Sequence, residues 1–316
     1  MLKNPAAADK VFELLLDYAC AAKCPFCYNP PLTPELLSRR LTFTAAADLL
    51  YLKRHEGCDG AWFTGGEPTQ RPDLLRLLRL ARRLGYRRVQ IGTNGWKASD
   101  PAYARALADA GLNYARVSIH GAEPATHDRI LGAAGAFAKA VAGLDALRAR
   151  GVAVGVNFVL CRWNLGELPD FAREARRWRI RDLDILFAHE RGMMAANARE
   201  LGLSYAECVP ALKSAFKIFR AAGLGPDEVR LVNFPPCVLP AALRPHAADW
   251  SRAEFSGHEL AHAEGSLESL AAMKSGQKVQ GPRCAACRLR AACAGYEPEY
   301  AARRGDAEFA PIRKKP

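Results

Sequence analysis

The chain has 316 residues, half of them hydrophobic and a quarter charged, which is the balance of a folded globular protein and not of a disordered one. No apolar run approaches the roughly 18 residues that a membrane-spanning helix needs, and the N-terminal residues lack the pattern of a signal peptide. Lysine and arginine outnumber aspartate and glutamate by 45 to 33, and the net charge of +12 suits a nucleic acid without by itself indicating one. We therefore expect a cytoplasmic protein with no membrane partner, whose ten cysteines are thiols or metal ligands rather than disulfides.

Short apolar segments, typical of buried strands, alternate with amphipathic segments, typical of helices, up to about residue 222. The expected strands are Val11–Leu16, Ala61–Thr64, Arg88–Thr93, Ala115–Ile119, Ala153–Leu160 and Leu183–Ala188. The expected helices lie near Thr44–Arg54, Asp73–Leu84, Pro101–Ala110, Phe137–Arg150, Leu168–Arg177 and Tyr205–Ala222. This alternation predicts an α/β fold with a parallel sheet, and its six units are fewer than the eight that close a full TIM barrel.

Polar residues and glycines follow the expected strands at the points where the strands end. Cys20 follows the first strand, Thr64–Pro68 the second, Thr93–Gly95 the third and Ser118–Gly121 the fourth, while Asn157 lies within the fifth. Ligands of parallel sheets gather at the carboxyl ends of the strands, so we expect a binding site along this edge.

Three cysteines, Cys20, Cys24 and Cys27, stand within eight residues of one loop. Iron–sulfur clusters are bound by cysteine thiolates, and a four-iron cube with three protein ligands leaves one iron open to another ligand. The alternative is a set of packed or zinc-bound thiols, although structural zinc sites usually pair one C-x2-C with a second pair. The spacing therefore favours a 4Fe–4S cluster.

This loop, with Phe26 as the aromatic residue of C-x3-C-x-aromatic-C, resembles the signature of the radical S-adenosylmethionine (SAM) superfamily. The run from Gly65 to Pro68 resembles the GGE motif of the same family, and the resemblance covers roughly residues 9–222. It implies a partial (β/α)6 TIM barrel, a radical SAM core domain over residues 1–222. It also implies that SAM chelates the open iron and is cleaved reductively to a 5′-deoxyadenosyl radical that abstracts a substrate hydrogen. A flavodoxin or a ferredoxin is the expected electron donor.

The resemblance also assigns roles to five residues around SAM. Gly65 and Gly66 would let the backbone approach the methionine moiety, and Glu67 would orient its ammonium group. Ser118 and Asn157 match positions that often contact the methionine carboxylate or the ribose, although both are also ordinary polar residues of strand ends. A segment that often carries an arginine in relatives has Leu131 in its place, and neither it nor the nearby Arg129 can be assigned the carboxylate contact.

A second cysteine group, Cys284, Cys287 and Cys293, lies in a short C-terminal region, residues 223–316, with no clear period before it. The group resembles the SPASM and twitch modules, which implies an auxiliary 4Fe–4S cluster; a zinc ribbon is the structural alternative. Glu297 occupies the place of a further cysteine of fuller modules, so we expect one auxiliary cluster. Cys237 is the candidate fourth ligand, and the alternative is an open iron that binds substrate.

The other cysteines and the histidines have weaker assignments. Single buried thiols are expected at Cys58, Cys161 and Cys208. His120 and His189 follow strands and either contact substrate or are packed and hydrogen-bonded, with His189 to Gly192 as the best remaining segment for a substrate or adenine contact. His258 and His262 have helical spacing and are expected on the surface.

The sequence leaves several substrates open. The auxiliary module favours modification of a ribosomally made peptide. About ten residues precede the first strand, so we expect a separate protein, or none, to recognise that peptide. The alternatives are a small-molecule dehydrogenase or cyclase in cofactor or natural-product synthesis, and an RNA-modifying enzyme of the same family, which the positive charge supports only weakly.

Overall fold

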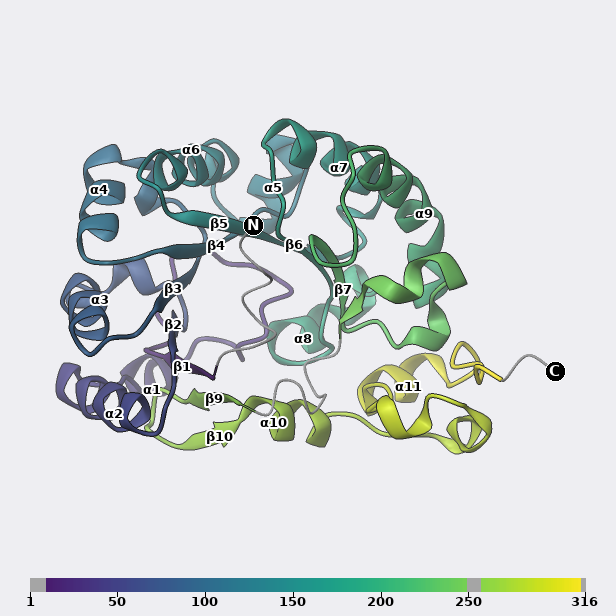
Figure 1. Ribbon diagram of the computed structural model, residues 1–316. Helices are drawn as coiled ribbons and strands as arrows, with labels where there is room; N and C mark the ends of the chain where they lie inside the picture. The colour runs from purple at the N-terminus through teal and green to yellow at the C-terminus, as the bar shows by residue number, and fades with distance from the viewer. Residues whose placement is uncertain (1–9, 249–256, 314–316) are drawn as a thin grey trace.

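The computed structural model describes residues 10–248 and 257–313, which contain one ten-stranded sheet in the order β10-β9-β1-β2-β3-β4-β5-β6-β7-β8 (Figure 1). The strands are β1 (Val11–Leu15), β2 (Gly60–Thr64), β3 (Arg88–Thr93), β4 (Tyr114–Ser118), β5 (Ala153–Leu160), β6 (Leu183–Phe187), β7 (Val229–Val232), β8 (Ala247–Ala248), β9 (His258–Ala261) and β10 (Leu267–Ser269). Neighbouring strands are parallel except β9 and β10. The predicted α/β fold with an open, partial barrel is confirmed.

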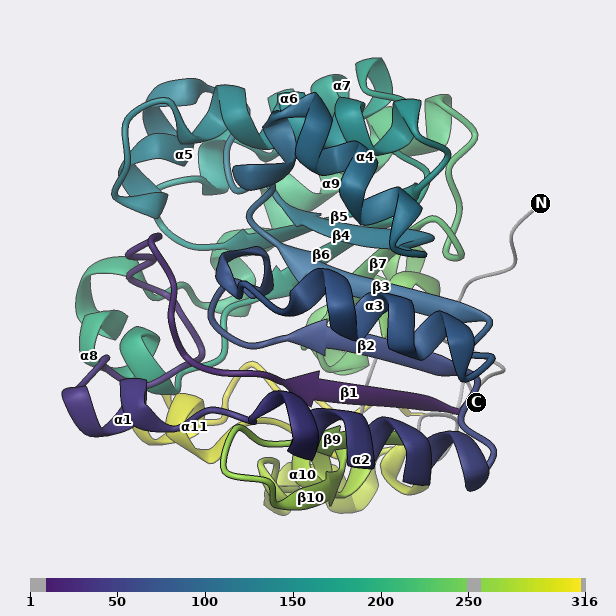
Figure 2. The same cartoon turned by 90° about the vertical axis from the view of Figure 1, so that its left-hand side faces the viewer.

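The α-helices lie between successive strands or after the last strand, and Figure 2 shows α2, α3 and α4 covering the outside of the curved sheet. They are α1 (Pro34–Ser38), α2 (Phe43–His55), α3 (Leu74–Arg83), α4 (Pro101–Asp109), α5 (Pro124–Leu131), α6 (Ala136–Ala149), α7 (Leu168–Arg177), α8 (Gly192–Leu201), α9 (Tyr205–Ala221), α10 (Leu270–Gly276) and α11 (Pro298–Arg304). Every predicted strand and helix is present, with its ends shifted by one residue at most. The caps explain some of these ends, because the Thr42 side chain accepts from the backbone at the start of α2 and Ser204 forms a capping box at the start of α9.

The two faces of the sheet differ in chemistry. Phe12, Leu14 and Phe63 are fully buried in the main hydrophobic core together with residues of the outer helices. Residues at alternate positions face the other way, because successive side chains of a strand point to opposite faces. This inner face is polar over seven strands: Glu13, Trp62, Gln90, Arg116, Asn157, Asp184 and Arg230.

The C-terminal region contributes to both edges of the sheet. The expected boundary between residues 222 and 223 falls between α9 and β7, and β7 pairs with β6 in the same sheet. On the other edge β9 pairs in parallel with β1, and β10 and α10 follow it. The sequence shows no clear period here because the described strands of this region are short and are held by pairing with strands far away in the chain.

No single helix among the described residues is long and apolar enough to cross a membrane; only α5 and α6 together meet the criteria of length and composition, and they are bent by 98°. The buried positions predicted for the three single cysteines are confirmed, with Cys58, Cys161 and Cys208 at most 2% exposed.

Candidate active site

The segment from Asp17 to Asn29, called the cluster loop below, follows β1 and carries the first three cysteines. Cys20, Cys24 and Cys27 are all partly buried, and the Cys27 amide donates to the Cys24 carbonyl at 3.1 Å. Burial, opposed by an Ala22 backbone hydrogen bond and reinforced by Glu67 and the neighbouring sulfur of Cys27, raises the pKa of Cys20 to about 11. Burial and the sulfurs of Cys27 and Cys20 raise the pKa of Cys24 even further. Thiols that disfavour one another's negative charge fit a metal centre, whose positive charge keeps thiolates ionised.

Helix α8, which the sequence did not reveal, holds the cluster loop from one side. The Met193 amide donates to the Cys27 carbonyl at 3.0 Å, and Asn197 Nδ2 donates to the Pro25 carbonyl at 2.9 Å. At Gly192, which has φ +57°, a Cβ atom would lie 2.1 Å from the carbonyl oxygen of Tyr28. The glycine that starts α8 therefore allows the loop and the helix to touch.

The two glycines after β2 hold the start of the same loop. The Gly66 amide donates to the Asp17 carbonyl at 2.8 Å, and a Cβ atom at Gly66 would lie 2.1 Å from the Ala19 oxygen. Gly65 has φ +137°, and its Cβ would lie 2.4 Å from the Asp17 oxygen. The close approach made possible by these glycines is thus to the cluster loop itself; an approach to SAM remains a prediction.

Glu67 is 3% exposed, and its carboxylate is occupied by hydrogen bonds within the chain. It accepts from the Thr69 amide at 3.1 Å and hydroxyl at 2.6 Å, from the Thr93 hydroxyl at 2.7 Å and from the Asn94 amide at 2.7 Å. Burial raises the pKa of Glu67, and these hydrogen bonds oppose the rise. The side chain thereby ties the turn after β2 to the turn after β3, and its expected contact with the SAM ammonium remains a prediction.

Ser118 and Asn157 are direct neighbours across β4 and β5, and both are partly buried at the carboxyl half of the sheet. Asn157 Oδ1 accepts a hydrogen bond from Arg116 Nη1 at 3.4 Å. The structure therefore brings together the two residues that the sequence proposed for the carboxylate or ribose of SAM, and their contact with it remains a prediction.

His120 is packed beside the cluster loop. It is 4% exposed, its Nδ1 accepts from the Val159 amide at 3.1 Å, and its ring meets Phe26 edge-on with centroids 4.9 Å apart. Of the two interpretations of this residue, the packed histidine is the one that the structure shows. Arg129 lies over the Trp163 ring, 3.7 Å from its centroid, and its guanidinium is 3.9 Å from a Glu200 carboxylate oxygen.

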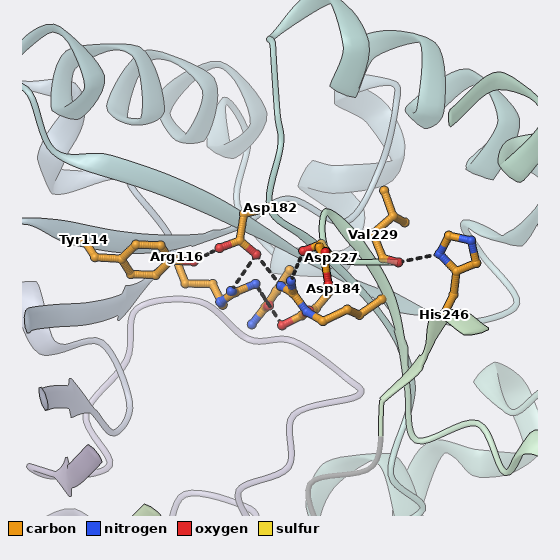
Figure 3. A network of polar contacts seen from close by, with 9 residues as sticks. Tyr114, Arg116, Asp182, Asp184, Asp227, Val229 and His246 are labelled. Atoms are coloured by element: carbon orange, nitrogen blue, oxygen red, sulfur yellow. Dashed lines mark hydrogen bonds and ion pairs between the residues drawn. The ribbon is translucent and has the colours of Figure 1, made fainter. Parts of the chain in front are cut away.

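A charged network crosses the inner face of the barrel in its amino-terminal half (Figure 3). Arg116 contacts Asp184 at 2.8 Å and Asp182 at 2.9 Å, and Arg230 contacts Asp184 at 2.6 Å and also Asp182. The Tyr114 hydroxyl donates to Asp182 at 2.7 Å. Two cations and two anions thus balance one another across β4, β6 and β7. Sequence reasoning missed them, although a charged residue inside each apolar strand was a signal.

The four C-terminal cysteines converge on a second site. The side chains of four cysteines line one cavity: Cys237, Cys284, Cys287 and Cys293. The cavity brings the predicted fourth ligand, Cys237, to the other three. Burial and the three neighbouring sulfurs raise the pKa of Cys237 to about 12. Such a set of sulfurs fits a metal cluster for the same reason as the first group. In the described part of the chain, no three His, Cys, Asp or Glu side chains are placed to bind a single metal ion.

The remaining histidines differ from expectation in one case. His258 lies in β9, is 6% exposed, and its Nε2 is 3.2 Å from Glu13 Oε2, so its expected place on a surface helix was wrong. Pairing with β1, which no local pattern reveals, turns this residue inward. His262 follows β9, is partly exposed, and lies 3.3 Å from Glu268.

Residues 16–175, just over half of the chain, match the family model of the radical SAM superfamily. A PqqA peptide cyclase of Gluconobacter oxydans is 37% identical over 168 residues, which are 51% of this chain and 44% of the relative. A PqqA peptide cyclase of Rhizobium meliloti is 34% identical over 194 residues, 59% of this chain and 49% of the relative. The chain therefore spans about half the length of the curated relatives it matches.

Solved structures of similar fold cover more of the chain. SuiB of Streptococcus suis, bound to the precursor peptide SuiA, has a TM-score of 0.67 over 97% of this chain and 75% of its own, at 11% identity. Native anSMEcpe with bound AdoMet and the Cp18Cys peptide has a TM-score of 0.65 over 95% of this chain and 92% of its own, at 14% identity. At these identities the likeness shows the shared fold.

The matched residues begin just before the cluster loop and run through β2 to β5, so they include the cysteines and both glycines after β2. The open, parallel sheet and the cysteines at its carboxyl edge agree with this match. The predicted family is therefore confirmed: the chain belongs to the radical SAM superfamily of enzymes.

Proposed function

We propose that this radical SAM enzyme oxidises a ribosomally made peptide. The proposal rests on one observation: both the proteins of similar sequence and the solved structures of similar fold have a peptide in their names or descriptions. The sequence relatives are PqqA peptide cyclases, and SuiB and anSMEcpe were solved with peptides bound. A peptide substrate is the class that these likenesses share.

Cys20, Cys24 and Cys27 would hold the 4Fe–4S cluster. Ser118 at the end of β4 and its neighbour Asn157 within β5 would bind SAM. The bound cluster and SAM supply the 5′-deoxyadenosyl radical that abstracts a substrate hydrogen. The chain's part is to hold the cluster loop through α8 and Gly66 and to exclude water around the radical. A flavodoxin or ferredoxin in the cytoplasm would supply the electron.

Cys237, Cys284, Cys287 and Cys293 would hold one auxiliary 4Fe–4S cluster with four cysteine ligands. Their shared cavity supports this assignment. A single auxiliary cluster is supported by Glu297, which stands in place of a cysteine and whose carboxylate accepts a hydrogen bond from the Glu190 amide. Such a cluster would suit an oxidation, because an oxidised iron–sulfur cluster can supply a one-electron acceptor.

The test incubates the anaerobically loaded protein with SAM, dithionite and each short peptide encoded beside its gene. We expect 5′-deoxyadenosine above background and a peptide that has lost two hydrogens, as measured by chromatography and mass spectrometry. If small molecules or tRNA stimulate 5′-deoxyadenosine formation and no peptide does, the peptide assignment is wrong.

A further inference from the structure

A row of three titratable side chains lies where the C-terminal region meets the carboxyl end of β6. His189 follows β6, Glu297 caps α11, and Lys274 belongs to α10. The His189 Nδ1 contacts one oxygen of Glu297, and the His189 Nε2 lies 3.5 Å from the Lys274 ammonium. The imidazole therefore stands between a carboxylate and a cation.

Other hydrogen bonds also hold the Glu297 carboxylate in place. Its second oxygen accepts from the Glu190 amide at 3.0 Å, and Asn233 Nδ2 lies 3.4 Å from the first. Glu297 is 2% exposed. A carboxylate held in this way accepts a hydrogen bond from the Nδ1–H group of His189, and this tautomer has its lone pair on Nε2.

The Nε2 side of His189 lies beside the cluster loop. Tyr28, the residue after Cys27, meets the His189 ring edge-on with centroids 5.4 Å apart, and the Lys274 ammonium lies 4.6 Å from the centre of the Tyr28 ring. Tyr28 is 40% exposed and the His189 side chain 17% exposed. The imidazole is thus accessible next to the loop that would hold the cluster.

Burial and the neighbouring lysines disfavour the protonated form of His189. Burial lowers its pKa, Lys274 and the more distant Lys278 lower it further, and Glu297 opposes them. Burial also lowers the pKa of Lys274 to about 8, against the pull of Glu297 and Glu13. No ion pair of Lys274 with a carboxylate is present within the described residues, whereas Arg191 and Glu190 are paired with Glu299 and Arg303.

We propose that Glu297, His189 and Lys274 form a proton-accepting site for the oxidation, with His189 Nε2 as the acceptor and the other two as positioning residues. The proposal rests on the proposed function. The substrate first loses a hydrogen atom from carbon to the 5′-deoxyadenosyl radical. A second substrate group then loses its proton to Nε2 as the new bond forms, and the remaining electron passes to an oxidised iron–sulfur cluster. Glu297 stabilises the imidazolium that results.

The geometry is tested without SAM or substrate, by NMR titration of the full chain with labelled histidines, in which His189→Gln assigns the signal. We expect a midpoint for His189 below the ordinary histidine value of about 6.5. Lys274→Met should raise the His189 midpoint by about half a pH unit or more, and Glu297→Gln should lower it by a similar amount. Lys213→Met, on the exposed face of α9, is the matched control. If the midpoint is the same in all these proteins, the proposed site does not exist.

The role is tested with a peptide that stimulates 5′-deoxyadenosine formation by the wild type. In His189→Gln, oxidised product per 5′-deoxyadenosine should fall by about 100-fold, because a general base contributes at least that much. A merely structural role would instead lower product and 5′-deoxyadenosine together and leave their ratio unchanged. If no peptide stimulates the wild type, the proposed function fails, while the titration still decides whether the three residues interact.

Discussion

The Glu67 carboxylate shows how one buried residue joins two turns of the site. Its four hydrogen bonds come from residues after β2 and after β3, and none of its four donors is a charged group. Burying a carboxylate costs folding free energy unless its oxygens accept hydrogen bonds. The charge of Glu67 is therefore tolerated because of its four donors, and these donors in turn need an acceptor.

Glu67→Gln should therefore lower the free energy of unfolding by about 2–3 kcal/mol, because the amide turns two hydrogens toward groups that also donate. Urea denaturation of the apoprotein measures this change. Glu35→Gln, which removes an exposed ion pair with Arg39, is the control and should cost much less stability than Glu67→Gln. Equal effects of the two substitutions would contradict the account of Glu67.

Gly66 is the residue at which the turn after β2 touches the cluster loop. Gly66→Ala should displace the loop by forcing a Cβ atom against the Ala19 carbonyl, and should cost about 1–3 kcal/mol together with much of the iron content. Gly166→Ala, at a glycine with open space around its Cβ and no positive φ, should retain wild-type iron. Normal iron loading of Gly66→Ala would show that the loop does not depend on this contact.

At the scale of elements, the ion-pair network holds β4, β6 and β7 together on the inner face of the barrel (Figure 3). Burial alone would raise the pKa of Asp182, but Arg116 and Arg230 hold it well below its usual range. The network therefore stabilises the fold while Asp182 is ionised.

Asp182→Asn should cost about 3–5 kcal/mol at pH 7, because it leaves two buried guanidinium groups with one carboxylate. Since the folded pKa is lowered, the contribution of Asp182 is present above its ordinary value of about 4 and is lost as the pH falls below it. Urea unfolding from pH 7 down to pH 3 should show the difference between wild type and variant shrinking with acid. Asp145→Asn, in an exposed pair with Arg148, is the control. A difference independent of pH would contradict this role.

Local patterns sufficed for elements whose burial follows from their own sequence. The six apolar strands and the amphipathic helices between them were predicted within one residue of their observed ends. Helix α8 was missed because its contacts are with the cluster loop, and β9 was missed because its partner is β1. The cysteines of the site could be predicted from their spacing. The contacts of His189, His258 and Glu67 could not, because they include residues far away in the chain.

At the scale of the whole molecule, the chain places two cysteine groups at separate points of one sheet-based structure. The first follows β1, and the second lines a cavity together with Cys237, which follows β7. Because β9 pairs with β1, the C-terminal region also packs against the strand that leads into the cluster loop. Because the two cysteine groups share no ligand and lie at separate points, loss of one is expected to leave the other in place.

Substitution of Cys237, Cys284, Cys287 and Cys293 by alanine should leave about four irons per chain, since only the cluster loop then retains ligands. SAM cleavage under dithionite should persist, while oxidised peptide per 5′-deoxyadenosine should fall. Iron assay and mass spectrometry measure both. About one zinc and four irons in the wild type would instead indicate a zinc ribbon at this cavity.

The most direct test of the central claim measures iron and 5′-deoxyadenosine in the same anaerobic preparations of the wild type and of the triple variant Cys20→Ala, Cys24→Ala, Cys27→Ala. We expect about eight irons per wild-type chain, from two four-iron clusters, and cleavage of SAM under dithionite. The triple variant should retain about four irons and form no 5′-deoxyadenosine. SAM cleavage by the triple variant would contradict the assignment of the radical-forming cluster to these three cysteines.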